Sequence, residues 1–214
     1  MSATAAPAAP APAGTTTPPP ASAGPRPWRI TRDEYYRLGE LGFFDGKRVE
    51  LIRGEVIEMS PINIAHARGV GFASDALTLV FALGCYINVQ QPFSVPSAAP
   101  GTEPQPDVAV LRGSRRTAGG HPTQAVLLVE VADSTLFYDT TTKAELYATA
   151  GVPEYWVLDL DGRTLHVFRD PRPLPLPPEL SATAYSTHVT FGPSDSVSPL
   201  AAPTATVRVA DLLP

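Results

Sequence analysis

The sequence predicts an α/β or α+β fold in which helices flank a mixed central sheet and extra strands lie at its periphery. Three observations lead to this class. Strand-like apolar segments outnumber helical ones along the chain. One of them, residues 125–131, is apolar on both faces, as in a central strand that is covered on both sides. Two other segments repeat apolar residues at helical spacing, so they can pack on such a sheet.

Length and composition place this sheet in one domain, residues 28–214. The chain has 214 residues, which is enough for a full core. Residues 1–27 form an Ala/Pro/Thr-rich leader that we expect to be disordered, because it cannot bury enough apolar area. The leader lacks the features of a secretory signal, and no apolar run is long enough for a membrane span. A single cysteine, Cys85, excludes an internal disulfide and a cysteine-built metal site. We therefore expect a cytoplasmic protein without membrane contact.

The amino-terminal part predicts a helix, a hairpin and a longer helix. The string Thr31-Arg-Asp-Glu34 fits a capping box, so a short helix should begin there and end near residue 38 or 41. Residues 48–59 have the pattern of a β-hairpin with its turn at Arg53-Gly54. Apolar residues at helical spacing predict a second helix from residue 63 or 64 to about residue 83, and Gly84 suits its C-terminal cap.

The remaining elements are strands around one further helix. Strands are expected at residues 86–95, 107–111 and 125–131, a helix at about 140–150, and strands at 154–159 and 163–169. The last two are joined by Asp161-Gly162, a strong hairpin signal. A proline-rich connection at 171–178 follows, and residues 188–191 and 204–209 are predicted to be peripheral strands.

Three charged residues lie within these apolar elements. Glu130 is the only polar residue of the expected central strand, and Asp107 opens another apolar strand. Lys143 shares one helical face with Leu146 and Tyr147. Burying such charges costs free energy unless they pair with each other or hold a metal. The residues alone leave other roles open: Glu130 could pair with a basic neighbour at a strand end, Asp107 could be a turn residue, and Lys143 could extend to solvent.

Together, these residues predict metal-dependent chemistry on a phosphodiester. Asp107 and Glu130, on adjacent strands, can hold Mg²⁺ or Mn²⁺ through oxygen ligands. The ion would polarise a phosphodiester oxygen and lower the pKa of a bound water, while Lys143 would orient that water or stabilise charge on the phosphate. Glu50 interrupts an apolar hairpin strand and is a further catalytic candidate that could reach the metal directly or through water. An ordinary solvent-facing position fits Glu50 equally well.

The segment that holds these residues resembles a known family. The pattern begins with Leu128 through Ser134-Thr135 and continues with Tyr138-Asp139, Lys143, Tyr147 and Gly151-Val-Pro-Glu-Tyr-Trp-Val-Leu-Asp159. It is similar to that of the Uma family of restriction endonucleases, which belongs to the PD-(D/E)XK nuclease superfamily. Residues 50–55, 60–66 and 106–110 match the same pattern, so the resemblance covers roughly residues 29–169.

This resemblance implies a restriction-endonuclease-like mixed sheet flanked by helices, with a divalent metal between Asp107 and Glu130. It also implies that Lys143 is the superfamily lysine moved from a strand to a helix. In the basic superfamily motif the lysine stands two residues after the glutamate, and here that position holds Ala132.

Supporting residues are expected around this site. His66, near the start of the long helix, could approach the site or a phosphate, or it could be a helix-cap or surface histidine. Asp139 precedes Lys143 by four residues and could position it. Ser134, just past Glu130, could give a supporting hydrogen bond or belong to the turn itself.

Charge gives a modest argument about the partner. The net charge is −5, with 21 acidic and 16 basic residues, which counts against DNA binding by charge alone. A bound cation could supply the missing positive charge. One local basic cluster, Arg112, Arg115 and Arg116, follows the Asp107 strand in a loop, where it could contact phosphates or remain solvated.

The leading hypothesis is therefore a Mg²⁺-dependent endodeoxyribonuclease that hydrolyses DNA phosphodiester bonds. The alternative is a catalytically inactive module that keeps the nuclease fold and binds nucleic acid or protein. The negative net charge and Ala132 at the usual lysine position support this alternative. A third hypothesis, a purely structural interaction domain, requires the three charges to lie at the surface. A homodimer is expected of a nuclease that cuts both strands.

Overall fold

The computed structural model describes residues 25, 27–98, 100–175 and 182–214, so the expected leader lies outside the described residues except for positions 25 and 27. A six-stranded sheet in the order β3-β4-β5-β6-β7-β8 forms the centre. Neighbouring strands are antiparallel except β5 and β6, which are parallel, so the expected mixed sheet is confirmed. The strands are β3 (Cys85–Val89), β4 (Val108–Arg112), β5 (Leu127–Ala132), β6 (Glu154–Asp159), β7 (Thr164–Pro173) and β8 (Thr183–Phe191).

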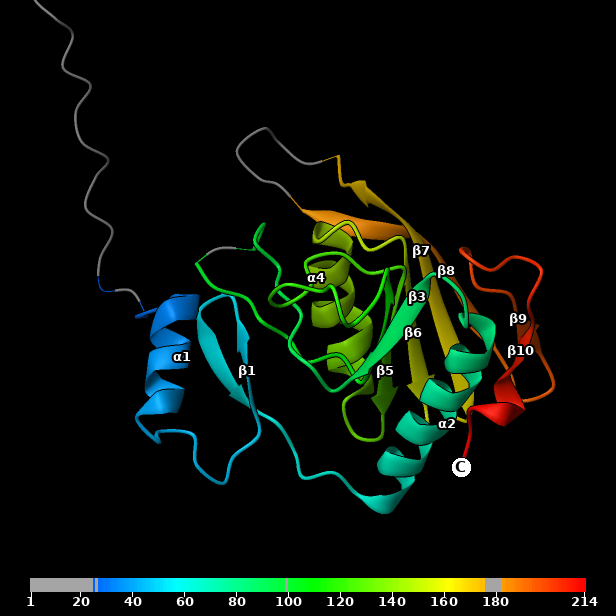
Figure 1. The fold of residues 1–214 in the computed structure, drawn as a ribbon, viewed down its shortest axis with the longest axis horizontal. Coiled ribbons are helices and arrows are strands. Elements are labelled where there is room, and N and C mark those ends of the chain that lie inside the picture. The colour runs from blue at the N-terminus through cyan, green and yellow to red at the C-terminus, as the bar shows by residue number, and fades with distance from the viewer. Residues whose placement is uncertain (1–24, 26, 99, 176–181) are drawn as a thin grey trace, which may run out of the picture.

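Helical segments cover both faces of this sheet (Figure 1). One face carries α2 (Ile64–Val80) and a carboxy-terminal group made of β9 (Ser196–Val197), β10 (Val207–Arg208) and the 3₁₀ turn η2 (Val209–Asp211). The opposite face carries one continuous helical segment, made of α3 (Leu136–Tyr138), the π-helical turn η1 (Asp139–Lys143) and α4 (Ala144–Thr149). None of the helices in the described ranges is both long and apolar enough to cross a membrane.

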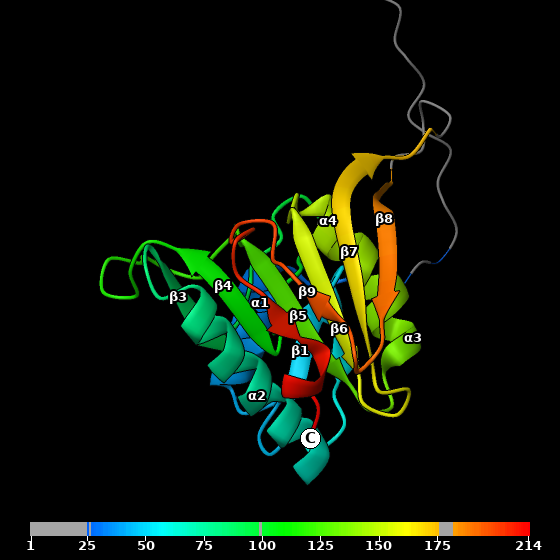
Figure 2. The same cartoon turned by 90° about the vertical axis from the view of Figure 1, so that its right-hand side faces the viewer.

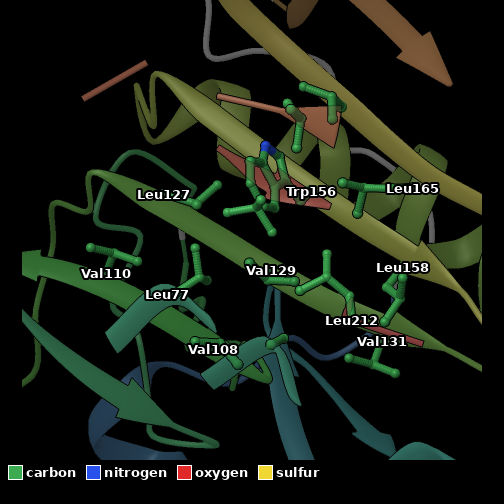
Figure 3. Close-up of a cluster of buried hydrophobic side chains, with 14 of the residues drawn as sticks. Leu77, Val108, Val110, Leu127, Val129, Val131, Trp156, Leu158, Leu165 and Leu212 are labelled. Carbon is green, nitrogen blue, oxygen red and sulfur yellow. The ribbon is translucent and has the colours of Figure 1, made fainter. Parts of the chain in front are cut away.

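Two apolar layers join these helices to the sheet. Figure 3 shows part of the layer under α2, which includes Leu77, Val129 and Trp156. The layer under α4 includes Leu128 and Ala132 of the same strand β5. Because alternate residues of a strand point to opposite faces, Glu130 lies on the α4 side of the sheet. The acid is thus placed beneath the helix that carries the lysine.

The amino-terminal elements pack beside α4. Helix α1 (Arg32–Glu40) begins with the expected capping box of Thr31 and Glu34. The expected hairpin is formed by β1 (Val49–Ile52) and β2 (Glu55–Glu58), and its turn residues Arg53 and Gly54 have φ values of 51° and 80°. Ile52 joins the apolar layer under α4, which fixes the hairpin against that helix.

Several element ends differ from those expected. β3 stops at Val89 rather than at residue 95, because Gln90 has a φ of 51° and breaks the extended backbone. Helix α2 ends at Val80 rather than near residue 83. The helical segment expected at about 140–150 begins at Leu136, four residues before its expected start. Residues 188–191, which were expected to form a peripheral strand, are the end of β8, the last strand of the central sheet.

The expected proline-rich connection is also partly wrong, because β7 continues through Pro173. Pairing of β7 with β6 ends at Arg169, so residues 171–173 are flanked by β8 alone. One side of β7 is therefore an open edge there, which is where a sheet tolerates proline. Residues 176–181 lie outside the described residues. The strand expected at 204–209 shrinks to β10, which pairs with β9 outside the central sheet.

Candidate active site

A small polar cleft opens between the start of α2 and the π-helical turn. Residues from β1, the start of α2, the start of β4, the end of β5 and the π-helical turn line it together. The lining residues are Arg48, Glu50, Met59, Ser60, Pro61, Ile62, Asn63, His66, Gln105, Asp107, Glu130, Val131, Asp133, Ser134, Thr135, Asp139 and Lys143.

Lys143 lies at the centre of this site and points inward. Its side chain is 1% exposed, and Nζ donates to Glu130 Oε1 at 2.9 Å and to Glu50 Oε1 at 3.1 Å. Burial acts to lower the pKa of Lys143, but the carboxylates of Glu130, Glu50 and Asp139 outweigh it and hold this pKa well above its ordinary value. The lysine is therefore a fixed ammonium, and the solvent-directed alternative is excluded.

Glu130 contributes the opposing carboxylate from the middle of β5. Its Oε1 also accepts a hydrogen bond from Tyr147 Oη at 2.7 Å. Burial raises the pKa of Glu130 well above its ordinary value, Lys143 opposes this shift, and the charge on Asp107 adds to it. Ionised Glu130 is thus incompletely compensated by the one ammonium, and a further cation nearby would stabilise its charged form.

Asp107, directly before β4, belongs to the same cleft but makes different contacts. Its Oδ2 accepts from the Val131 amide at 2.9 Å and lies 3.2 Å from His66 Nε2, while Oδ1 accepts from Gln90 Nε2 at 3.1 Å. Burial acts to raise the pKa of Asp107, but the hydrogen bond and charge of His66, with the Val131 and Gln90 donors, lower it overall. Lys143 pairs with Glu130 and Glu50 rather than with Asp107, whose carboxylate is held by His66 and the Val131 amide.

Two further carboxylates complete the cluster. Glu50 on β1 is buried rather than solvent-facing, and its Oε1 also accepts from the Gln105 amide at 2.9 Å. Glu50 Oε2 is buried without a hydrogen-bond partner in the described part of the chain. Asp139, the first residue of the π-helical turn, accepts from Thr135 Oγ1 at 2.5 Å. Burial raises the pKa of Asp139 to about 6, although Lys143 opposes the shift.

The weaker candidates divide into residues that reach the cleft and residues that do not. His66 joins it through Asp107. Ser134 lines the cleft, but the hydrogen bond to Asp139 comes from its neighbour Thr135. The basic residues Arg112, Arg115 and Arg116 lie at the far end of β4 and line other surface hollows.

Arg48 is a cleft residue that sequence reasoning missed. It is half-buried, and its Nη1 donates to the Ser60 carbonyl at 3.3 Å. A signal was present, since Arg48 stands two residues before Glu50 and alternate residues of an extended segment share a face. Together with Lys143 and His66, it supplies the basic side chains among the described lining residues.

The donor set fits a hard divalent cation, with carboxylates from two strands. Among the described residues, no group of three or more His, Cys, Asp or Glu side chains could hold a metal ion. Mg²⁺, however, is often held by one or two carboxylates while water completes its shell. Asp107 and Glu130 provide such a pair, and Glu50 Oε2 is a buried oxygen that lacks a donor. The cleft buries four carboxylates and one lysine, and a bound cation would stabilise the charged forms of these acids.

Comparison with known proteins adds a family and a fold. The model of the Uma2 family, described as "Putative restriction endonuclease", matches residues 32–200. A solved structure described as "a putative nuclease belonging to DUF820", from Anabaena variabilis ATCC 29413, is similar with a TM-score of 0.65 and 18% sequence identity. The similarity covers 86% of this chain and 97% of that chain, and at this identity it shows a shared fold. No curated protein matches the chain.

Proposed function

This chain belongs to the Uma2 family, and from that membership we propose that it is a metal-dependent endonuclease that hydrolyses DNA phosphodiester bonds. The supporting observation is the convergence of Glu130, Asp107 and Glu50 on a cleft that also holds the buried ammonium of Lys143. A structural interaction domain would not need this group of buried charges. Mg²⁺ or Mn²⁺ is the cofactor that such oxygen donors suit.

Asp107 and Glu130 are the residues that would hold the cation. When bound, a divalent ion would polarise the scissile phosphate and lower the pKa of the attacking water. Lys143 stays protonated in the proposed reaction, and its ammonium orients the water or stabilises negative charge as it develops on the phosphate. Glu50 Oε2, which is buried and lacks a partner, is positioned to accept a hydrogen bond from a water in the cleft.

The phosphate would enter from the side of α2 and Arg48. The amino-terminus of α2 opens on the cleft, and its first turn contains no acidic residue. Free amide donors and the helix dipole favour an anion at such a position. The Arg48 guanidinium lines the same cleft. These groups offset part of the repulsion that the acidic cluster exerts on a nucleic acid.

Cleavage of supercoiled plasmid, linear duplex, single-stranded DNA and RNA, with Mg²⁺, Mn²⁺ or EDTA, tests the proposal. We expect the wild type to cut DNA only with a divalent ion, and Glu130→Gln to lose this activity. Glu58→Gln is the matched control, because Glu58 is an exposed acid on β2 outside the cleft lining. Absence of cleavage with either ion, together with absence of ion binding by calorimetry, contradicts the proposal.

The same measurements separate the second candidate, an inactive nuclease-fold module. Ala132 at the usual lysine position favours that candidate, as does the direct hydrogen bonding of Lys143 to two carboxylates. An inactive module predicts that the wild type binds nucleic acid or protein without cutting, and that Lys143→Met leaves this binding unchanged. The endonuclease predicts loss of cutting in the same variant.

A further inference from the structure

Helix α2 has an outer face that the described residues leave uncovered. Its inner face buries Gly69, Val70, Ala73 and Leu77 against the sheet. Figure 2 shows this helix on the outside of the molecule. The outer face carries large apolar side chains, with Ile64 74% exposed, Phe72 40% and Leu79 83%. A surface helix normally presents polar residues there, and a row of exposed apolar residues marks an interaction site.

The outer face is self-complementary when read in the opposite direction. The exposed residues of α2 stand at positions 64, 65, 67, 68, 71, 72, 75, 78 and 79, and all of them except Ala67 form pairs that are symmetric about the midpoint between Gly71 and Phe72. A second, antiparallel copy of the helix therefore brings Ile64 opposite Leu79 and Gly71 opposite Phe72. A two-fold symmetric interface has this property, because residue i meets residue j and residue j meets residue i.

The charges on this face follow the same symmetry. Arg68 and Asp75 stand seven residues apart, about 10 Å along the helix axis, so their positions are too distant for a pair within one helix. Neither of them forms an ion pair with any other described residue of the chain. In the antiparallel arrangement, Arg68 of each copy faces Asp75 of the other. This charge order selects a second copy of the same chain as the occupant.

Gly71 supports the same arrangement. A glycine weakens the interior of a helix, so its presence calls for a reason. Gly69 has one within the chain, because an added Cβ would lie 2.9 Å from Val131 Cγ1. A Cβ on Gly71 would meet nothing within 4 Å in the described structure. Room for the Phe72 ring of a partner helix would explain this glycine, for which the described residues give no other reason.

We propose that α2 is the homodimer interface of this protein, with the helices of two copies packed antiparallel around Gly71 and Phe72. Ile64 and Leu79 form the apolar ends of the interface, and Arg68 and Asp75 form two reciprocal ion pairs. The interface also has a functional consequence, because the first turn of α2 brings His66 into the candidate active site. Dimerisation through α2 thus fixes two such sites relative to each other.

Charge reversal with rescue tests the proposal by light scattering and sedimentation of the full chain. The wild type is expected to show twice the 22.6 kDa chain mass. Arg68→Asp and Asp75→Arg each place like charges opposite each other and should weaken self-association by about tenfold or more. The double variant restores both pairs and should dimerise again. A mixture of the two single variants should form heterodimers, because each supplies the charge that the other lacks.

A second comparison addresses the apolar part. Leu79→Ser should weaken the dimer, whereas Phe43→Ser should not, because Phe43 is also exposed but lies outside α2. Circular dichroism checks that every variant remains folded. A wild type that is monomeric at all concentrations overturns the proposal. A dimer that persists in both single charge-reversal variants also overturns the proposal. So does dissociation of the single variants if neither the double variant nor the mixture restores the dimer.

Discussion

Replacing Lys143 with methionine removes a buried ammonium while keeping an unbranched side chain of similar size. The packing of the side chain is largely retained, so the loss reports on charge. The ammonium lies 2.9 Å from Glu130 Oε1 and 3.1 Å from Glu50 Oε1, and all three side chains are buried. Removing one partner of a buried ion pair costs about 3–5 kcal/mol, because the remaining charge is left uncompensated. We expect a loss of this size in the free energy of unfolding at about pH 8.

The loss should shrink as the pH falls. Burial raises the pKa of Glu130, and Lys143 is the charge that opposes this shift, so the folded-state pKa rises further in the variant. A group whose folded pKa is raised contributes stability that is present below its unfolded pKa and lost as the pH rises through its folded pKa. The variant is therefore less impaired near pH 5 than near pH 8, because a lower pH favours the neutral form of Glu130.

Urea unfolding followed by circular dichroism at both pH values, with EDTA present, measures this difference. Lys47→Met is the matched control, because Lys47 pairs with Glu58 at 3.0 Å but is 51% exposed. Exposed ion pairs contribute little, so the control should change stability only slightly at either pH. A Lys143→Met loss that is equal at the two pH values, or as small as the control, would refute the reasoning from buried charge.

Three further predictions concern neighbours of this site. Burial raises the pKa of Asp139 from 3.8 to about 6, so the wild type should lose about 3 kcal/mol of unfolding free energy as the pH rises from about 4 to about 7. Asp139→Asn should remove this loss, as measured by urea unfolding across that pH range. Tyr147→Phe deletes the 2.7 Å hydrogen bond to Glu130 and should cost about 2 kcal/mol in the same assay at neutral pH; an unchanged value would show that water replaces the hydroxyl. Gly69→Ala places a Cβ 2.9 Å from Val131 Cγ1 and should lower the unfolding free energy by about 1–2 kcal/mol in thermal melts, whereas a gain would mean that the helix shifts freely.

The sequence was sufficient where one local pattern decides the structure. The capping box at Thr31 and the hairpin turn at Arg53-Gly54 involve residues close in the chain, and both occur in the structure. Glu130 could be placed in a central strand because its neighbours are apolar on both sides. Lys143 could be placed against the sheet because the residues that share its helical face are buried. Each of these inferences needs only periodicity.

The sequence was not sufficient where the position of a side chain depends on the direction of an element or on a contact distant in the chain. Asp107 and Arg112 are five residues apart in one extended segment, a distance of about 17 Å, so the basic cluster lies away from the cleft and its contact with phosphates stays a prediction. The partner of Asp107, His66, comes from a helix that precedes it by 41 positions. No local pattern shows that this carboxylate turns to a histidine and leaves Lys143 to Glu50. The length of β8 was also hidden, because its side chains are mostly half-buried or exposed and lack an apolar signature.

The ammonium of this site comes from a helical segment rather than from strand β5. Ala132 faces the α4 side of the sheet as Glu130 does, so a lysine at residue 132 would have reached this region directly from the strand. In this chain the ammonium arrives from the end of the π-helical turn, where the Ala144 amide donates to the Asp139 carbonyl. A π turn accommodates one more residue than an α turn, and one residue corresponds to about 100° of rotation around a helix. The extra residue rotates Asp139, which begins the turn, and Thr135, which precedes it, relative to the face that Lys143 shares with Leu146 and Tyr147. The π turn therefore sets the direction from which the Asp139 carboxylate approaches the lysine, whereas α-helical spacing alone keeps Lys143 on the buried face.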